Sequence, residues 1–275
     1  MVINKNINNL DKKPFFIAEI GINHGGSLKK AKLLIDDAVE AGADAVKFQT
    51  YISELRAPKN NKNIFDILKT CELNYEDFKV LKDYSEYKGI IFFSTPFDIE
   101  SVDYLSSIGV SIGKIASFDT TNTDLISHAA SKFNSLIFST GMTSLLQINE
   151  CLKLIVKNKC EPIILHCISS YPLEAKDARL SNINYLKENY GEYKIGYSDH
   201  SNGIKIPLYA ISLGANIIEK HFMLENDDCI DRPVSISKIK FKEMVTEANI
   251  LIEIMGNQEF GVRDAERSAL TFRRY

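Results

Sequence analysis

Several features that define special classes of protein are scarce or missing in this sequence. Its five cysteines among 275 residues are odd in number and form no CxxC pair, which favours a reducing cytoplasm over a disulfide framework. No apolar run approaches the length of a membrane span, and no apolar segment before Pro14 resembles a signal peptide. The net charge of −3 argues against a general surface for nucleic acid or an anionic membrane. Together these absences predict a soluble cytoplasmic protein that binds neither nucleic acid nor membranes.

The sequence also lacks an internal linker and any low-complexity segment. Its hydrophobic fraction of 45% and charged fraction of 25% are ordinary for a globular chain with a sizeable core. We predict a polar leader over residues 1–13, one domain over 14–257 and a tail over 258–275.

Short β-rich runs alternate eight times with amphipathic helical stretches. Residues 27–42 carry an apolar stripe typical of a helix, with Ser27 as its N-cap and Gly42 at its end, and a last helix is expected over 235–256. The alternation requires parallel strands with right-handed crossovers, and the number of units favours a (β/α)₈ TIM barrel over a large open sheet. The predicted strands are 15–21, 45–51, 90–97, 111–117, 135–141, 162–170, 193–200 and 216–223.

Polar residues gather where the predicted strands end, whereas the strand beginnings are apolar. A TIM barrel carries its chemistry at the carboxyl ends of its strands, so this one-ended polarity predicts an active site. The pattern does not identify the reaction, and each serine taken singly is better explained as a turn or a helix cap. The strand-end residues are Glu19, Asn23, His24, Lys47, Gln49, Ser94, Thr95, Lys114, Ser117, Ser139, Thr140, His166, Ser169, Tyr171, Ser198, His200, Glu219 and His221.

Lys47 and Lys114 lie inside otherwise apolar runs, AVKFQTY and GKIAS. An unpaired ammonium in a buried strand is costly to desolvate, so two of them predict an anionic ligand held inside the fold. The neighbouring serine and threonine hydroxyls fit a phosphate or a carboxylate. The alternative is a pair of structural ion pairs with strand-end carboxylates such as Glu19 or Asp119.

Side-chain parity brings further groups together, because alternate strand residues point to the inside of a barrel. His200 and His221 end neighbouring strands, and two imidazoles with open positions for oxygen ligands suit Mn²⁺, Co²⁺ or Zn²⁺ better than Mg²⁺. The alternative is a pair of hydrogen-bonded histidines without a metal. Parity does not align Lys114 with Ser117, so one of them must lie beyond its regular strand.

The one long excursion from the alternation is residues 52–89, between the second and third strands. It combines an Asn/Lys-rich loop with extra helical material. A segment of this kind over a barrel mouth acts either as a substrate lid or as a passive surface loop.

At these residues the chain resembles the sialic acid synthase family, which condenses phosphoenolpyruvate with an N-acetylated sugar aldehyde. The resemblance runs from about Phe15 to the C-terminus, and it implies the family's barrel and its reaction class. The blocks that carry it are AEIGINHGG (18–26), AGADAVKFQTY (41–51), FSTPFDIESVDYL (93–105), KIAS (114–117), STGM (139–142), LHCISSYP (165–172), GYSDHSNGI (196–204) and LGANIIEKHFML (213–224).

The resemblance implies a role for each matching residue. Glu19 is identified as the base for the attack of water, and Asp119 and Asp231 are expected to face the sugar. The implied catalytic residues are Glu19, Lys47, Lys114 and Glu219. The implied substrate-binding residues are Thr95, Ser117, Asp119, Ser139, Ser169, Tyr171, Ser198 and Asp231.

The implied activity is that of a transferase that forms a C–C bond with the help of a metal. Phosphoenolpyruvate, water and an N-acyl hexosamine such as N-acetylmannosamine would give a sialic-acid-like nonulosonic acid and phosphate. His200 and His221 would hold the metal, for which we predict Mn²⁺, with Co²⁺ or Mg²⁺ as alternatives, and the enzyme is expected to be a homodimer. One alternative is an aldol synthase for a phosphorylated sugar, with Lys59, Lys62 and Arg232 at the second phosphate. The other is a non-catalytic binding or scaffold member.

Three departures from the family pattern concern the sugar side and the length. Phe118 stands where the family has Gly, Asp119 where it has the longer Glu, and Arg232 where it has His. Residues 258–275 are expected to be a remnant of the linker to the family's C-terminal antifreeze-like domain. That domain adds an arginine to the sugar site, so weaker acceptor affinity is expected here unless another group makes the contact.

Overall fold

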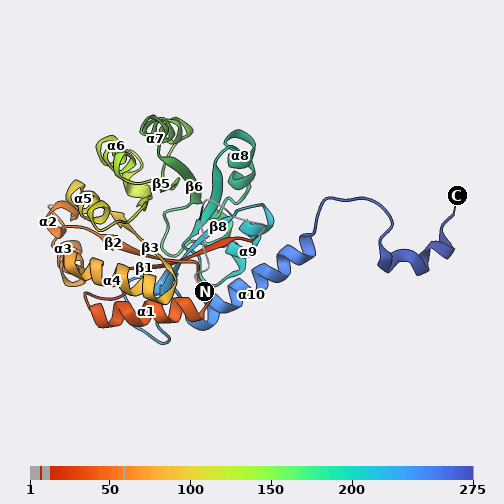
Figure 1. Ribbon diagram of the computed structural model, residues 1–275, viewed down its shortest axis with the longest axis horizontal. Coiled ribbons are helices and arrows are strands. Elements are labelled where there is room, and N and C mark those ends of the chain that lie inside the picture. The colour runs from red at the N-terminus through yellow and green to blue at the C-terminus, as the bar shows by residue number, and fades with distance from the viewer. Residues whose placement is uncertain (1–6, 8–12, 58–59, 275) are drawn as a thin grey trace.

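The strands of this protein close into a barrel. The computed structural model describes residues 7, 13–57 and 60–274, and Figure 1 shows helices arranged around the strands. Within the described residues one sheet runs in the order β1 to β9, and β1 also pairs with β8, so the first eight strands form a closed parallel ring. This confirms the predicted (β/α)₈ barrel. The strands are β1 (Phe15–Gly21), β2 (Ala45–Thr50), β3 (Ile91–Pro96), β4 (Ile112–Ile115), β5 (Ser135–Ser139), β6 (Glu161–Cys167), β7 (Lys194–Asp199), β8 (Ile217–Met223) and β9 (Ile236–Ser237).

Helices follow the strands and cover the outside of the barrel. None of the helices in the described part of the chain is long and apolar enough to cross a membrane. The α-helices are α1 (Leu28–Glu40), α2 (Ser53–Arg56), α3 (Lys62–Cys71), α4 (Tyr75–Lys88), α5 (Ile99–Ser107), α6 (Thr123–Lys132), α7 (Leu145–Lys157), α8 (Ser181–Asn189), α9 (Lys205–Ser212) and α10 (Lys238–Met255). Four 3₁₀ segments, η1 (Ser117–Asp119), η2 (Ala175–Asp177), η3 (Arg232–Val234) and η4 (Asp264–Phe272), complete the described elements.

Helix α1 illustrates how local sequence sets an element's ends. Ser27 is the N-cap, and its hydroxyl accepts a hydrogen bond from the backbone N–H of Lys30 at 3.2 Å. After the helix, Gly42 takes a φ of +84°, which an L side chain rarely adopts. The prediction over 27–42 is therefore confirmed apart from its end residues. Helix α10 begins at Lys238 rather than at residue 235, because η3 and β9 precede it.

Six of the eight predicted strands end one to three residues earlier than expected, among them β4 and β6. Strand β4 stops at Ile115 instead of residue 117, and β6 stops at Cys167 instead of residue 170. After β4 the chain turns into η1, where the Thr120 hydroxyl donates to the carbonyl oxygens of Ala116 (3.2 Å) and Ser139 (2.9 Å). Ser117 thus lies beyond the regular strand, which explains why parity alone does not align it with Lys114.

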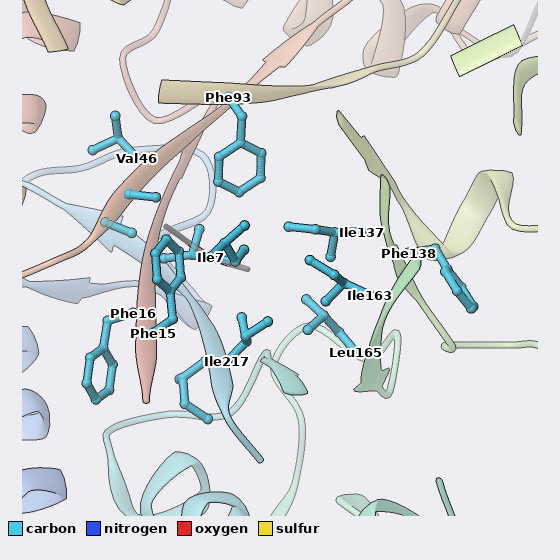
Figure 2. Close-up of a cluster of buried hydrophobic side chains, with 14 of the residues drawn as sticks. Ile7, Phe15, Phe16, Val46, Phe93, Ile137, Phe138, Ile163, Leu165 and Ile217 are labelled. Carbon is cyan, nitrogen blue, oxygen red and sulfur yellow. The ribbon is translucent and has the colours of Figure 1, made fainter. Parts of the chain in front are cut away.

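The hydrophobic core fills the barrel and the layer between strands and helices. Figure 2 shows Ile7 among side chains such as Phe15, Ile163 and Ile217, and Ile7 is buried as part of the same cluster. Most of the predicted leader over 1–13 lies outside the described residues.

The barrel register places the strand-end residues side by side. Glu19 on β1 is aligned with Lys47 on β2 and with His221 on β8. Ser198 on β7 is aligned with Glu219 on β8. Because parallel neighbours in register present these side chains to one end of the barrel, residues up to about two hundred positions apart meet at one mouth.

Candidate active site

A polar cavity opens at the carboxyl ends of the barrel strands. Twelve of the fourteen predicted site residues line it: Glu19, Lys47, Thr95, Lys114, Ser117, Ser139, Tyr171, Ser198, His200, Glu219, His221 and Asp231. The other two, Asp119 and Ser169, lie outside this lining. Almost the whole predicted constellation is therefore brought into one space.

The two lysines and two glutamates form one buried network at the floor of the cavity. Lys47 Nζ lies 2.8 Å from Glu19 Oε2 and 3.8 Å from Glu219 Oε2, and it donates to Thr95 Oγ1 at 3.1 Å. Lys114 Nζ lies 3.5 Å from Glu219 Oε1 and donates to Ser139 Oγ at 2.6 Å. Glu219 thus sits between both ammonium groups, and all four ionic side chains are at least 95% buried.

This network bears on the two explanations of the lysines. The expected structural ion pairs exist, with Glu19 and Glu219 rather than with Asp119. Although burial alone would raise it, the pKa of Glu219 is lowered to about 2, because Lys114 and Lys47 stabilise the carboxylate. Burial lowers the pKa of Lys114, while Glu19 and Glu219 outweigh burial and raise the pKa of Lys47. Both lysines nevertheless face the cavity, so ion pairing and anion binding are compatible.

Two serine hydroxyls, those of Ser117 and Ser169, converge next to Gly141. The backbone N–H of Gly141 donates to Ser117 Oγ at 3.1 Å. Ser169 Oγ is buried and has no hydrogen-bond partner among the described residues. A Cβ at position 141 would lie 2.3 Å from Ser169 Oγ and 2.7 Å from Ser117 Oγ. Because Gly141 has no side chain, both hydroxyls can occupy the space beside it. The buried, unpaired hydroxyl of Ser169 indicates a ligand group that completes its hydrogen bonding.

We expect Gly141→Ala to weaken the binding of phosphoenolpyruvate at least 10-fold, because the new methyl group must displace two hydroxyls that suit a charged ligand. Titration calorimetry with phosphoenolpyruvate measures the effect. Gly25→Ala is the control: Gly25 has a φ of +57° and no atom within 4 Å of a Cβ, so this change strains the backbone without crowding the site. Equal affinities for Gly141→Ala and the wild type would contradict the role of these hydroxyls.

The two predicted metal ligands lie together in the same cavity. The His200 and His221 rings are 5.4 Å apart between centroids, and Tyr171 lies over His200 with ring centroids 4.1 Å apart. His200 Nδ1 is 2.9 Å from the carbonyl oxygen of Ile168, an arrangement in which Nδ1 donates and Nε2 keeps its lone pair. Burial, and then His221, lower the pKa of His200 to about 4, so this imidazole is neutral near pH 7.

The residues present fit a divalent cation in two respects. A neutral imidazole with a hydrogen-bonded Nδ1 is the form in which histidine binds metals. The formal charges of the cavity lining also cancel. A multiply charged anion would therefore enter a site with no net positive charge, and a divalent cation would supply that charge. These charges are positive on Lys47, Arg56 and Lys114, and negative on Glu19, Glu219 and Asp231. The described residues contain no group of three or more His, Cys, Asp or Glu placed to hold a metal, so further ligands would be water or substrate.

Asp231 reaches the cavity from the loop after β8 and is positioned by Asn23. The Asp231 backbone N–H donates to Asn23 Oδ1 at 2.9 Å, and Asn23 Nδ2 donates to Ser235 Oγ at 3.0 Å. Asp231 Oδ2 lies 3.3 Å from His221 Nδ1. Burial acts to lower the pKa of His221, but the effect of Asp231 is stronger, so this pKa is raised. Burial acts to raise the pKa of Asp231, but the effect of His221 is stronger, so this pKa is lowered.

The positions that depart from the family pattern lie at the rim or outside it. Phe118 lines the cavity with 62% of its surface exposed, and Asp119 is half-buried behind it. Arg232 is exposed and pairs with Asp228 at 3.2 Å, away from the cavity lining. Lys62 is exposed on α3, and Lys59 lies outside the described residues. The cations proposed for a second phosphate are therefore not gathered at the described part of the cavity.

Sequence reasoning missed one charged residue of the cavity, Arg56. It ends α2 in the 52–89 excursion, and its guanidinium enters the cavity from the rim. In the printed sequence it is a single arginine in the mixed polar and apolar stretch YISELRAP, where no periodic pattern marks it as buried. Burial lowers the pKa of Arg56, and Tyr51, Asp119 and Asp231 oppose this effect.

Comparison with known proteins places this geometry in a family. The model of the NeuB family matches residues 34–260. The N,N'-diacetyllegionaminic acid synthase of Campylobacter jejuni is 35% identical, and the match covers 94% of this chain and 81% of that protein. The N-acetylneuraminate-9-phosphate synthase of Homo sapiens is 31% identical over 88% of this chain and 71% of its own length.

Solved structures agree with the sequence matches. The N-acetylneuraminic acid synthetase of Leptospira borgpetersenii, crystallised with citrate, superposes with a TM-score of 0.90 at 41% identity, covering 95% of this chain and 91% of its own. A truncated 3-deoxy-D-arabino-heptulosonate 7-phosphate synthase of Thermotoga maritima shares the fold at a TM-score of 0.70 and 16% identity. Because the family model spans most of the chain and close relatives match nearly its full length, this protein belongs to the NeuB family, as its resemblance to the sialic acid synthases predicted.

Proposed function

We propose that this chain condenses phosphoenolpyruvate with an open-chain N-acyl hexosamine and water, giving a sialic-acid-like nonulosonic acid and phosphate. The observation that carries the proposal is one cavity in which the buried Lys47 and Lys114 stand beside the carboxylates of Glu19 and Asp231. The relatives named as legionaminic, pseudaminic and N-acetylneuraminate-9-phosphate synthases support this reaction class.

The floor of the cavity suits phosphoenolpyruvate. Its phosphate and carboxylate would be held by Lys47 and Lys114, with hydroxyls of Ser117, Ser139 and Ser169 as neutral donors. Glu219 lies between the two ammonium groups, and its carboxylate stabilises the positive charge of each. Holding the anion in one orientation removes much of the entropic cost of bringing C3 to the acceptor.

The bond changes follow from the enol phosphate. Its C3 attacks the aldehyde carbon of the acceptor, the aldehyde oxygen becomes a hydroxyl, and positive charge develops at C2. Water then adds to C2 as Glu19 accepts one of its protons, and the C–O bond to phosphate breaks when the tetrahedral adduct collapses to a ketone. The two protons of the water end on the new hydroxyl and on the released phosphate. Glu19 is suited to orient this water because Gln49 Nε2 at 3.1 Å and Lys47 Nζ at 2.8 Å fix its two oxygens.

His200 and His221 would hold a divalent metal, for which we propose Mn²⁺, with Co²⁺ or Mg²⁺ as alternatives. When bound, such an ion supplies Lewis-acid polarisation of the acceptor aldehyde. Its charge would also compensate a substrate anion in a cavity whose own formal charges cancel. Asp231 is placed to orient the acceptor against this part of the site.

We also propose that the protein acts as a homodimer in the cytoplasm. All five cysteines are free, and four of them are buried, as expected in a reducing compartment. The segment after α10 extends away from the barrel in Figure 1, and Phe260 and Phe272 are almost fully exposed along it. Exposed aromatic side chains on such a segment favour a second subunit as its partner.

Release of phosphate from phosphoenolpyruvate tests the proposed function. We expect release with Mn²⁺ and N-acetylmannosamine or a diacetamido hexose, and a product whose mass equals acceptor plus pyruvate. The 6-phosphate of N-acetylmannosamine is the comparison acceptor. Faster release with this phosphorylated sugar would replace the proposal by a phosphosugar synthase. Binding of phosphoenolpyruvate without release for any acceptor would show a non-catalytic member.

A further inference from the structure

The excursion between β2 and β3 is packed onto the barrel mouth by a small apolar cluster of its own. This cluster joins Ile22, Tyr51, Leu68 and Cys71, with Phe97 against it. Polar contacts also anchor the segment: the Tyr51 hydroxyl donates to the Leu68 carbonyl at 2.9 Å, and the Ile52 N–H donates to Asp98 Oδ2 at 2.9 Å. The start of the excursion is therefore a fixed wall of the cavity rather than a passive surface loop.

Arg56 is held in this wall by aromatic rings. Its guanidinium carbon lies 3.6 Å from the centroid of Phe97 and 4.5 Å from that of Tyr51. These stacking contacts fix the plane of the guanidinium and leave its N–H edges free for hydrogen bonds. The side chain lines the same cavity as Lys47 and Asp231.

The guanidinium is incompletely paired. Nη1 of Arg56 is buried and has no hydrogen-bond partner within the described ranges. A buried cationic donor without an acceptor is unfavourable, so a position like this one indicates a ligand oxygen that completes it. Each donor that a ligand then satisfies adds a charge-assisted hydrogen bond.

The surrounding charges indicate what kind of oxygen. The negative groups that act on Arg56 are Asp119, Asp231 and Glu19. Of these, Glu19 is itself paired with Lys47 in the anion half of the site, the network of Lys47 and Lys114 with Glu19 and Glu219, which leaves Asp119 and Asp231 as the carboxylates outside that network. A second anionic group next to Arg56 would therefore meet carboxylates as well as the guanidinium. An uncharged carbonyl or hydroxyl oxygen meets no such repulsion.

We propose that Arg56 is a further substrate-binding residue that donates hydrogen bonds to uncharged oxygen atoms, an acyl carbonyl or hydroxyls, of the acceptor sugar. The inference rests on the proposed function, because it assumes an amino-sugar acceptor. It makes the wall formed by the β2–β3 excursion part of acceptor selection.

Arg56→Met and Arg56→Lys test this role. We expect Arg56→Met to raise the KM for N-acetylmannosamine about 10- to 100-fold while the KM for phosphoenolpyruvate changes less than 3-fold. Arg56→Lys should recover only part of the loss, because an ammonium lacks the planar fork. Lys62→Met, an exposed cation in the same excursion, is the matched control and should behave as the wild type. Thermal unfolding of each variant identifies any loss of folding.

A second measurement separates this inference from the proposed function. The alditol of N-acetylmannosamine cannot react, so its affinity for the protein saturated with phosphoenolpyruvate and Mn²⁺ reports acceptor binding alone. A wild type that binds this alditol and an Arg56→Met variant that binds it at least 10-fold more weakly support the inference. Equal affinities, equal losses for both substrates, or a loss confined to the 6-phosphate acceptor overturn it. A folded wild type that neither binds the alditol nor releases phosphate overturns the proposed function itself.

Discussion

Glu19→Gln is expected to lower kcat by about 10²- to 10⁴-fold, the usual contribution of a positioned general base. The amide keeps the size of the side chain but cannot accept the proton of the attacking water. Phosphoenolpyruvate binding should be retained or become tighter, because the variant removes a negative charge 2.8 Å from Lys47 Nζ. Steady-state kinetics for turnover and calorimetry for phosphoenolpyruvate separate the two effects.

Glu247→Gln is the control for Glu19→Gln, since Glu247 is an exposed carboxylate on the outer helix α10. It changes the net charge by the same amount and should leave both kcat and affinity unaltered. Turnover at the wild-type rate in Glu19→Gln would remove Glu19 as the base. A parallel loss of phosphoenolpyruvate binding would instead show that the Glu19–Lys47 pair organises the anion half.

The second large effect is expected from replacing both candidate metal ligands. His200→Ala combined with His221→Ala should lower kcat/KM by more than 10³-fold and abolish Mn²⁺ binding, because it removes both imidazoles of the half-site. Treating the wild type with a chelator should give the same loss, which Mn²⁺ or Co²⁺ should reverse. Added metal should not restore the double variant. Equilibrium dialysis with Mn²⁺ and the phosphate-release assay measure both properties.

His128→Ala is the matched control for the histidine variants. His128 lies on helix α6 outside the barrel, where its Nε2 is 2.9 Å from Asp103 Oδ1. This variant should bind Mn²⁺ and release phosphate as the wild type does. If the double variant still turns over and is insensitive to chelator, the metal site is not formed by His200 and His221.

Much of the fold was predictable because it depends on local patterns. The eight strands coincide with short apolar runs, and α1 begins at a serine cap and ends before a glycine with positive φ, features that are set by neighbouring residues. The position of the cavity was also predictable. Polar side chains at the ends of parallel strands must meet at one mouth once the strands close into a ring.

The partners of the charged residues were not predictable in the same way. We expected two unpaired lysines, but Lys114 is paired with Glu219. This residue lies 105 residues after Lys114 in the sequence and 3.5 Å from it in the fold. Arg232, which the phosphosugar alternative places near a second phosphate, pairs with Asp228 on the surface. Arg56 gave no signal, because its burial depends on packing against Phe97, which follows the next strand in the sequence, as well as against the nearby Tyr51.

The sequence by itself therefore determined the barrel, the end of the barrel at which chemistry takes place, and the residue types available there. These follow from hydrophobic periodicity and from the sequence blocks that resemble the sialic acid synthase family. Both are patterns of residues that lie close together in the sequence. The tertiary structure decided which lysine meets which glutamate, which side chains stay at the rim and how Arg56 comes to line the cavity. Those outcomes depend on strand register and on side-chain packing between distant segments, and no local pattern encodes them.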